Sequence, residues 1–265
     1  MVSLPILLAL AALSLSQPAL AQEEQVPLSS TPQLPDDYSC EHPSSKVHLV
    51  SKSPLVIYIE NFVPHQERLH LQSLADGHFT HSGVVGAGGA STRHAVRTSQ
   101  STSIPWDKLV NCIGSRALEI QGFDLDDSHL EPLQLVKYAP TERYHFHTDW
   151  FTDPERAVPS LGGNRLSSIF AYVKADNVTG GGTNFPILRV PGGEQWCEFV
   201  DCDEEYENGV TFKPIEGNAI YWENMLTPGK GDDRVLHAGL PVVSGEKIGM
   251  NIWTREKPLP ADVRA

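Results

Sequence analysis

Basic residues are scarce in this 265-residue sequence, in which 20 Lys and Arg stand against 33 Asp and Glu for a formal net charge of −13. A surface with this balance repels nucleic acid and anionic membranes, so we expect neither as a partner. Glycine-rich segments occur at 86–89 and 180–182, but no Lys-Ser or Lys-Thr follows them, which argues against a phosphate-binding loop. The length and the 40% apolar content are typical of one globular domain.

Long apolar runs are also rare. The run from Leu4 to about Leu15 is too short to span a bilayer comfortably. Pro18 and then Ala19-Leu20-Ala21 follow it, and small-x-small is the pattern of a signal-peptide cleavage site. We expect residues 1–21 to be a signal peptide that directs the chain to the secretory pathway, either to the endoplasmic reticulum lumen or for secretion. A retained membrane anchor is the alternative.

Cysteines are few and lack the close C-x-x-C spacing of a zinc site. In an oxidising compartment the four can form two disulfides. The spacing leaves the connectivity open, and the preferred pairing is Cys40 with Cys112 and Cys197 with Cys202. Asn177-Val178-Thr179 is an N-glycosylation sequon, which agrees with the secretory interpretation.

Proline, serine and acidic residues dominate 22–52, and we expect a flexible lead-in there. An ordered domain over 53–258 should begin with a strand at Leu55–Ile59, and 259–265 should be a tail. A helix is predicted over 64–75, with Leu69 and Leu74 facing inward, and another over 106–120. Short strand-like runs separated by turns then predict a β sandwich or jelly roll, within a mainly β fold with flanking helices (α+β). These runs are 133–138, 166–173, 210–212, 219–222 and 247–254.

The segment Tyr144-His145-Phe146-His147-Thr148-Asp149 is the main candidate for chemistry. Alternate residues of an extended strand face the same way, so His147 and Asp149 could bind one cation together. Two histidines and one carboxylate on one face of an octahedron leave three positions open, as in non-haem Fe(II) oxygenases. His145 is the alternative ligand, through His145-x-His147.

The remaining ligand must come from a distant segment, and His237 is the candidate. Lys247 follows ten residues later. A buried ammonium at that position could bind the distal carboxylate of a dicarboxylate such as 2-oxoglutarate. Taken singly, His237 would be an ordinary structural histidine and Lys247 a solvated lysine, so the prediction depends on their combination with His147-x-Asp149.

Several blocks occur in the order found in the prolyl 4-hydroxylase family. Tyr138-x-x-Thr141-x-x-Tyr144-x-x-His147-x-Asp149 resembles its Tyr-x-x-Gly-x-x-Tyr-x-x-His-x-Asp motif, and 181–186 resembles its Gly-Gly-x-Thr-x-Phe-Pro block with one residue missing. The segments 97–99, 214–219 and 237–241 are similar to further blocks, and the resemblance runs from about residue 55 to 256. Thr141 departs from the family glycine and would strain the turn if that position has a positive φ.

The resemblance implies a double-stranded β-helix (a jelly-roll, cupin-like core) and an enzyme that uses Fe(II), 2-oxoglutarate, O2 and ascorbate. It also implies site roles. Iron would be bound by His147, Asp149 and His237, the co-substrate by Lys247, Tyr138 and Tyr172, and a peptide substrate by Tyr144, Arg165 and Trp253. Judged alone, Tyr172 and Trp253 would more often be core aromatics, and Arg165 a surface ion-pair partner.

The leading hypothesis is therefore a 2-oxoglutarate-dependent dioxygenase that 4-hydroxylates peptidyl proline and releases succinate and CO2. The same cofactors acting on another residue or on a small molecule form the second hypothesis, because fold and ligands cannot choose between them. A non-enzymatic secreted binding module with a vestigial metal site is the third. The sequence does not indicate an oligomeric state.

Overall fold

The computed structural model of the chain describes residues 34, 38–85, 91–92, 97–189 and 192–264. The expected signal peptide lies outside the described residues. The helices are α1 (His65–Ala75), α2 (Lys108–Gln121) and α3 (Ala261–Arg264). The strands are β1 (Lys46–Lys52), β2 (Leu55–Glu60), β3 (Thr80–His81), β4 (Val84–Val85), β5 (Ser91–Thr92), β6 (Gln100–Ser103), β7 (Gln134–Tyr138), β8 (Tyr144–His147), β9 (Arg165–Lys174), β10 (Thr179–Gly180), β11 (Thr183–Phe185), β12 (Val210–Phe212), β13 (Ala219–Glu223), β14 (Met225–Thr227), β15 (Lys230–Gly231), β16 (His237–Gly239), β17 (Val242–Ser244) and β18 (Lys247–Arg255). No described helix is long and apolar enough to cross a membrane.

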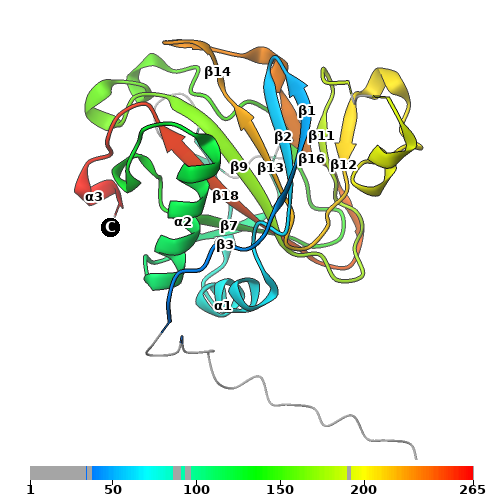
Figure 1. Cartoon of the computed structure of the whole chain (residues 1–265), viewed down its shortest axis with the longest axis horizontal. Coiled ribbons are helices and arrows are strands. Elements are labelled where there is room, and N and C mark those ends of the chain that lie inside the picture. The colour runs from blue at the N-terminus through cyan, green and yellow to red at the C-terminus, as the bar shows by residue number, and fades with distance from the viewer. Residues whose placement is uncertain (1–33, 35–37, 86–90, 93–96, 190–191, 265) are drawn as a thin grey trace, which may run out of the picture. The chain divides into compact units, whose positions relative to one another are not determined.

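Two antiparallel sheets form the framework. The large sheet has eight strands in the order β1-β2-β13-β9-β18-β7-β6-β3, and the small sheet has four in the order β12-β11-β16-β8. Sequence neighbours are often in different sheets, as a jelly roll requires. Figure 1 shows α1 and α2 beside the large sheet, away from β11, β12 and β16. The fold is a double-stranded β-helix with flanking helices, as the sequence predicted.

Both faces of the large sheet are covered. On β9, Ile169 and Ala171 belong to the core cluster that includes the helices, whereas Phe170 and Tyr172 belong to the cluster shared with the small sheet. The pleat sends alternate side chains to opposite faces, so one strand contributes to two cores. This explains the apolar run Ile169–Val173 within β9, because these residues are buried on both sides of the sheet.

Helix α2 follows its prediction closely. The Asp107 carboxylate accepts a hydrogen bond from the Val110 backbone N–H at its start, and Gly122 ends it in the left-handed conformation with φ 68°. Helix α1 differs in its buried face. Leu74 packs against the core, but Leu69 is 40% exposed.

Polar residues occupy the inward positions of α1 because they have partners on α2. Glu67 accepts two hydrogen bonds from the Arg116 guanidinium, each 2.7 Å, and His70 lies 2.6 Å from the Asp107 carboxylate. Hydrophobic spacing alone could not reveal these partners.

Order begins earlier than the sequence indicated. Residues 46–52, assigned to the flexible lead-in, form the edge strand β1, which pairs with β2 from Lys46↔Glu60 to Lys52↔Leu55. Val47 is 57% exposed, so the strand has little of the apolar burial that sequence patterns detect. Its order comes from backbone pairing with β2.

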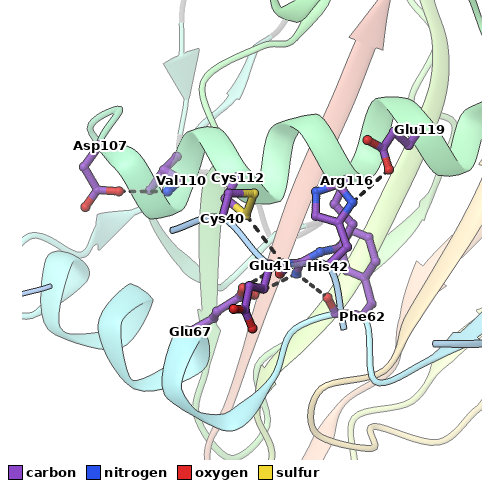
Figure 2. The surroundings of a disulfide bond; sticks show 10 residues. All are labelled: Cys40, Glu41, His42, Phe62, Glu67, Asp107, Val110, Cys112, Arg116 and Glu119. Atoms are coloured by element: carbon purple, nitrogen blue, oxygen red, sulfur yellow. Dashed lines mark hydrogen bonds and ion pairs between the residues drawn. A yellow bond between two sulfur atoms is a disulfide. The ribbon is translucent and has the colours of Figure 1, made fainter. Parts of the chain in front are cut away.

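Both preferred disulfide pairings are confirmed. Cys40 bonds to Cys112 and Cys197 to Cys202, each with a Cα–Cα distance of 5.4 Å. Figure 2 shows the first bond fastening the segment before β1 to α2, beside the Arg116–Glu67 ion pair. Arg116 also donates hydrogen bonds to the backbone carbonyls of Phe62 and Glu41, so a single guanidinium ties the lead-in, the end of β2 and both helices together.

We expect Arg116→Leu to lower the free energy of unfolding by about 3–5 kcal/mol, because it leaves the buried Glu67 carboxylate without its partner. Urea unfolding with the disulfides intact measures this. The double variant Arg116→Leu/Glu67→Leu should recover part of the loss, while Lys46→Ala, in the exposed pair with Glu60, should change stability by less than about 1 kcal/mol. A single variant as stable as the wild type would contradict this account.

Candidate active site

Strands β8 and β16 of the small sheet bring the three predicted ligands together. His147 pairs with His237 across these strands, and Asp149 follows β8 directly. One donor atom from each side chain lies within 4.8 Å of the others. Asp149 is 6% exposed and His237 also 6%, whereas His145 is exposed and is not part of this group.

A β-bulge in β8 sets which side chains face the site. His147 pairs with His237 and Tyr144 with Gly239, so three residues along β8 span two along β16. The extra residue shifts the alternation and brings Tyr144 onto the side of His147 despite their odd spacing. Their rings stack with centroids 3.6 Å apart, and the Arg97 guanidinium lies 4.7 Å from the Tyr144 ring centroid.

Backbone carbonyls fix the tautomers of both histidines. The Nδ1 atom of His147 lies 2.8 Å from the His145 carbonyl, and that of His237 lies 2.9 Å from the Val235 carbonyl. A carbonyl can only accept, so each Nδ1 carries a proton, and each Nε2 faces the space beside the Asp149 carboxylate, where it can bind a metal ion. Each Nε2 is 3.8 Å from an Asp149 oxygen. This is the arrangement expected of metal-ligating histidines.

Burial and neighbouring charges set the protonation states of His147 and Asp149. Burial, followed by the neighbouring His237, lowers the pKa of His147 to about 3, so this imidazole is neutral in the physiological range. Burial alone would raise the pKa of Asp149, but the two histidines, Arg165 and the Ser168 hydroxyl lower it to about 2. His147 therefore offers a neutral imidazole and Asp149 an ionised carboxylate.

Lys247 is fully buried and lacks a carboxylate partner among the residues that the structure describes. It pairs with Tyr138 across β18 and β7, its ammonium lies 4.6 Å from the Tyr138 ring centroid, and it donates to the Gly181 carbonyl. Burial lowers its pKa to about 7. Tyr172 is also buried, and its hydroxyl donates to the Thr183 hydroxyl at 2.8 Å.

A cavity of about 680 Å³ opens onto the ligand group. The predicted residues His147, Asp149, His237, Tyr138, Tyr144, Arg165 and Trp253 all line it, whereas Lys247 and Tyr172 lie behind its wall. Its other lining residues are largely aromatic or polar. They include Arg97, Glu131, Gln134, Trp150, Phe151, Phe170, Trp222 and Asn251.

Known proteins are similar to this chain in sequence and in fold. Residues 133–255 match the family model of the 2OG-Fe(II) oxygenase superfamily. Among curated relatives from Arabidopsis thaliana, prolyl 4-hydroxylase 2 is 33% identical and probable prolyl 4-hydroxylase 4 is 32% identical, each over 217 residues that cover 79% of this chain and 70% of the relative. The chain belongs to the prolyl 4-hydroxylase-like 2-oxoglutarate–Fe(II) oxygenases. The fold is also that of the viral collagen prolyl hydroxylase from Paramecium Bursaria Chlorella virus-1, solved with 2-oxoglutarate, at TM-score 0.53 and 24% identity over 76% of this chain and 95% of that one.

The cofactors of a 2-oxoglutarate–Fe(II) oxygenase fit the residues present. Two imidazole nitrogens and one carboxylate, converging in a buried group, form a donor set suited to Fe(II) with positions left for 2-oxoglutarate and O2. Lys247 is an ammonium that has no counter-ion in the described part of the chain, and it suits a carboxylate of the co-substrate because pairing would offset its desolvation cost.

The sequence did not reveal the side chains that contact Arg165 in the cavity wall of this oxygenase. Glu131 accepts two 2.7 Å hydrogen bonds from Arg165 and one of 3.0 Å from Arg255. The Arg165 guanidinium also stacks 3.6 Å from the Trp253 ring centroid. Glu131 lies outside every recognised motif. Arg97 lies in a block that resembles the family, yet nothing in its residue spacing places it in the cavity.

Asn177, the sequon residue, is exposed in the turn between β9 and β10, where an attached glycan would meet solvent.

Thr141 has φ 73°, so the departure from the family glycine puts a β-branched residue into the left-handed region just before β8. Its backbone N–H donates to the Val242 carbonyl at 2.8 Å, which holds the turn in place.

We expect Thr141→Gly to raise the free energy of unfolding by about 0.5–1 kcal/mol, because relief of the left-handed strain exceeds the entropic cost of glycine. Urea unfolding measures the gain. Thr80→Gly, in the extended strand β3, should instead lose stability. A destabilised Thr141→Gly variant would show that the turn is unstrained.

Proposed function

We propose that this chain 4-hydroxylates peptidyl proline, with Fe(II), 2-oxoglutarate, O2 and ascorbate, and releases succinate and CO2. The observation that carries the proposal is the convergence of His147, Asp149 and His237 at an aromatic-lined cavity, with Lys247 buried nearby and no counter-ion for it among the described residues. The prolyl 4-hydroxylase names of the plant relatives support proline as the target.

In this proposal His147, Asp149 and His237 ligate the iron. When bound, the metal supplies the oxidative decarboxylation of 2-oxoglutarate and the hydroxylation of a substrate C–H bond. The chain supplies the Nε2 atoms of His147 and His237, whose rings are oriented by the hydrogen bonds from Nδ1 to backbone carbonyls. It also supplies the ionised carboxylate of Asp149. Lys247 binds the distal carboxylate of 2-oxoglutarate, with the rings of Tyr138 and Tyr172 as the walls of that pocket.

The peptide would lie across the aromatic wall of the cavity, contacting Tyr144, Arg165 and Trp253. Trp150 and Phe151 extend this surface. Aromatic-lined grooves bind proline-rich segments well, because extended proline-containing peptides lose little conformational entropy on binding. Arg165 would contact the peptide only through the remaining part of its guanidinium, since its polar edge is bonded to Glu131 and one face is stacked on the Trp253 ring.

The proposal places the reaction in the secretory pathway. The expected signal peptide at 1–21, the two disulfides and the exposed sequon at Asn177 all agree with an oxidising, glycosylating compartment. Both residence in the endoplasmic reticulum lumen and secretion are compatible with these features.

Incubation of the protein with Fe(II), 2-oxoglutarate, ascorbate and a proline-rich peptide library should yield 4-hydroxyproline by mass spectrometry, with one succinate released per hydroxylation. His147→Ala should abolish both products because it removes a ligand. His145→Ala, two residues away on the same strand, should retain them. Hydroxylation confined to other residues would reject proline as the target, and no substrate-coupled succinate would reject the enzyme.

The dissociation constant for 2-oxoglutarate should depend on pH through Lys247. Below its pKa of about 7 the ammonium is charged and binding is constant. Above pH 7 the free protein must take up a proton to bind, so the dissociation constant should rise by up to about tenfold per pH unit. Calorimetry with Mn(II)-loaded protein measures this profile.

Lys247→Met should bind 2-oxoglutarate about 30-fold or more weaker at pH 6.5 and lose the dependence above pH 7. Lys174→Met is the control. It removes a partly exposed lysine on the neighbouring strand β9 that pairs with Glu246, and it should keep the wild-type profile. A Lys247→Met profile that still rises above pH 7 would assign the titration to another group.

A further inference from the structure

A chain of buried hydrogen bonds runs behind Asp149. The Ser168 hydroxyl, on β9, lies 2.6 Å from Asp149 Oδ2, and the Asn224 amide nitrogen lies 2.9 Å from the Ser168 oxygen. Ser168 is 1% exposed and Asn224 0%, so water cannot replace either partner.

The direction of this chain is fixed by its chemistry. A carboxylate can only accept, so the single hydroxyl proton of Ser168 must point to Asp149. The serine oxygen can then only accept a hydrogen bond from Asn224, so the NH2 group of Asn224 donates to it. Asn224 therefore orients the hydroxyl, and the hydroxyl orients the carboxylate.

The backbone holds Asn224 rigidly. Its N–H donates to the Leu166 carbonyl at 2.7 Å, and its carbonyl accepts from the Asp232 N–H at 2.8 Å, at the base of the β14–β15 hairpin. Its side-chain oxygen, in contrast, is buried without a hydrogen-bond partner in the described structure. An unpaired buried acceptor is costly, so the residue is a poor choice for stability alone.

We propose that Ser168 and Asn224 are positioning residues that make Asp149 a one-oxygen ligand. The inference rests on the proposed iron site. Ser168 engages Oδ2, which leaves Oδ1 with free lone pairs for the cation. A carboxylate that turned to offer both oxygens would fill a coordination position needed for 2-oxoglutarate or O2. The pair thus preserves both metal affinity and the open positions.

Co(II) titration of the metal-free protein, followed by visible absorption, tests this without turnover. Ser168→Ala should weaken Co(II) binding by about 10–100-fold, the effect typical of a lost partner behind a metal ligand. It should also weaken 2-oxoglutarate binding to the Co(II)-saturated protein. Ser167→Ala is the matched control, because this buried serine is the adjacent residue on β9 and bonds to Gln121 instead. It should leave Co(II) affinity unchanged.

Two Asn224 variants test the chain itself. Asn224→Asp keeps the shape but adds a second acceptor that competes for the hydroxyl proton, so it should weaken Co(II) binding as much as Ser168→Ala. Asn224→Ala should weaken Co(II) binding less than Asn224→Asp does. The double variant Ser168→Ala/Asn224→Ala should bind Co(II) no worse than Ser168→Ala alone. Independent, additive losses would overturn the proposed chain. Far-UV circular dichroism of each metal-free variant checks that it is folded.

Asp149→Ala separates this inference from the proposed function. If it binds Co(II) like the wild type, the metal site and the function both fail. If it loses binding while folded Ser168→Ala binds normally, the site stands and the positioning role is wrong.

Discussion

The pairing of β8 with β16 is the constraint on which the rest of the site depends. It places His147 opposite His237, ninety positions later in the chain, and its bulge turns Tyr144 to the same side. A shift of one residue in this register would turn the ligands to the opposite face. The β11–β16 pairing and the core between the sheets hold β16 in register, so the ligand geometry is a property of the whole β-helix.

The site buries groups that can carry charge. Asp149 and Lys247 are both buried, and Lys247 lacks a counter-ion among the described residues. Such groups cost stability unless they are paired. The two packed clusters and the Cys40–Cys112 bond provide the stability that tolerates this cost. Bound iron and 2-oxoglutarate would complete the pairing, so ligand binding should stabilise the fold by linkage.

Residue spacing in the sequence predicted the parts of the site that depend on local backbone geometry. His147-x-Asp149 follows from strand alternation, and Thr141 could be recognised as a positive-φ position. The bulge could not be predicted, because it exists only relative to β16. Ser168, Glu131 and Asn224 were missed for the same reason, since each acts through a partner far away in sequence. The edge strand β1 and the polar inward face of α1 likewise depend on partners rather than on apolar spacing.

Side-chain contacts hold one wall of the cavity in a fixed arrangement. Both oxygens of Glu131 bond to Arg165, and one of them also bonds to Arg255. The Arg165 guanidinium then stacks on the Trp253 ring. Because Glu131 offsets one of the two guanidinium charges and fixes both groups in place, the wall presents a flat, rigid surface. Such a surface favours shape-based recognition of an extended peptide, since little side-chain entropy remains to be lost on binding.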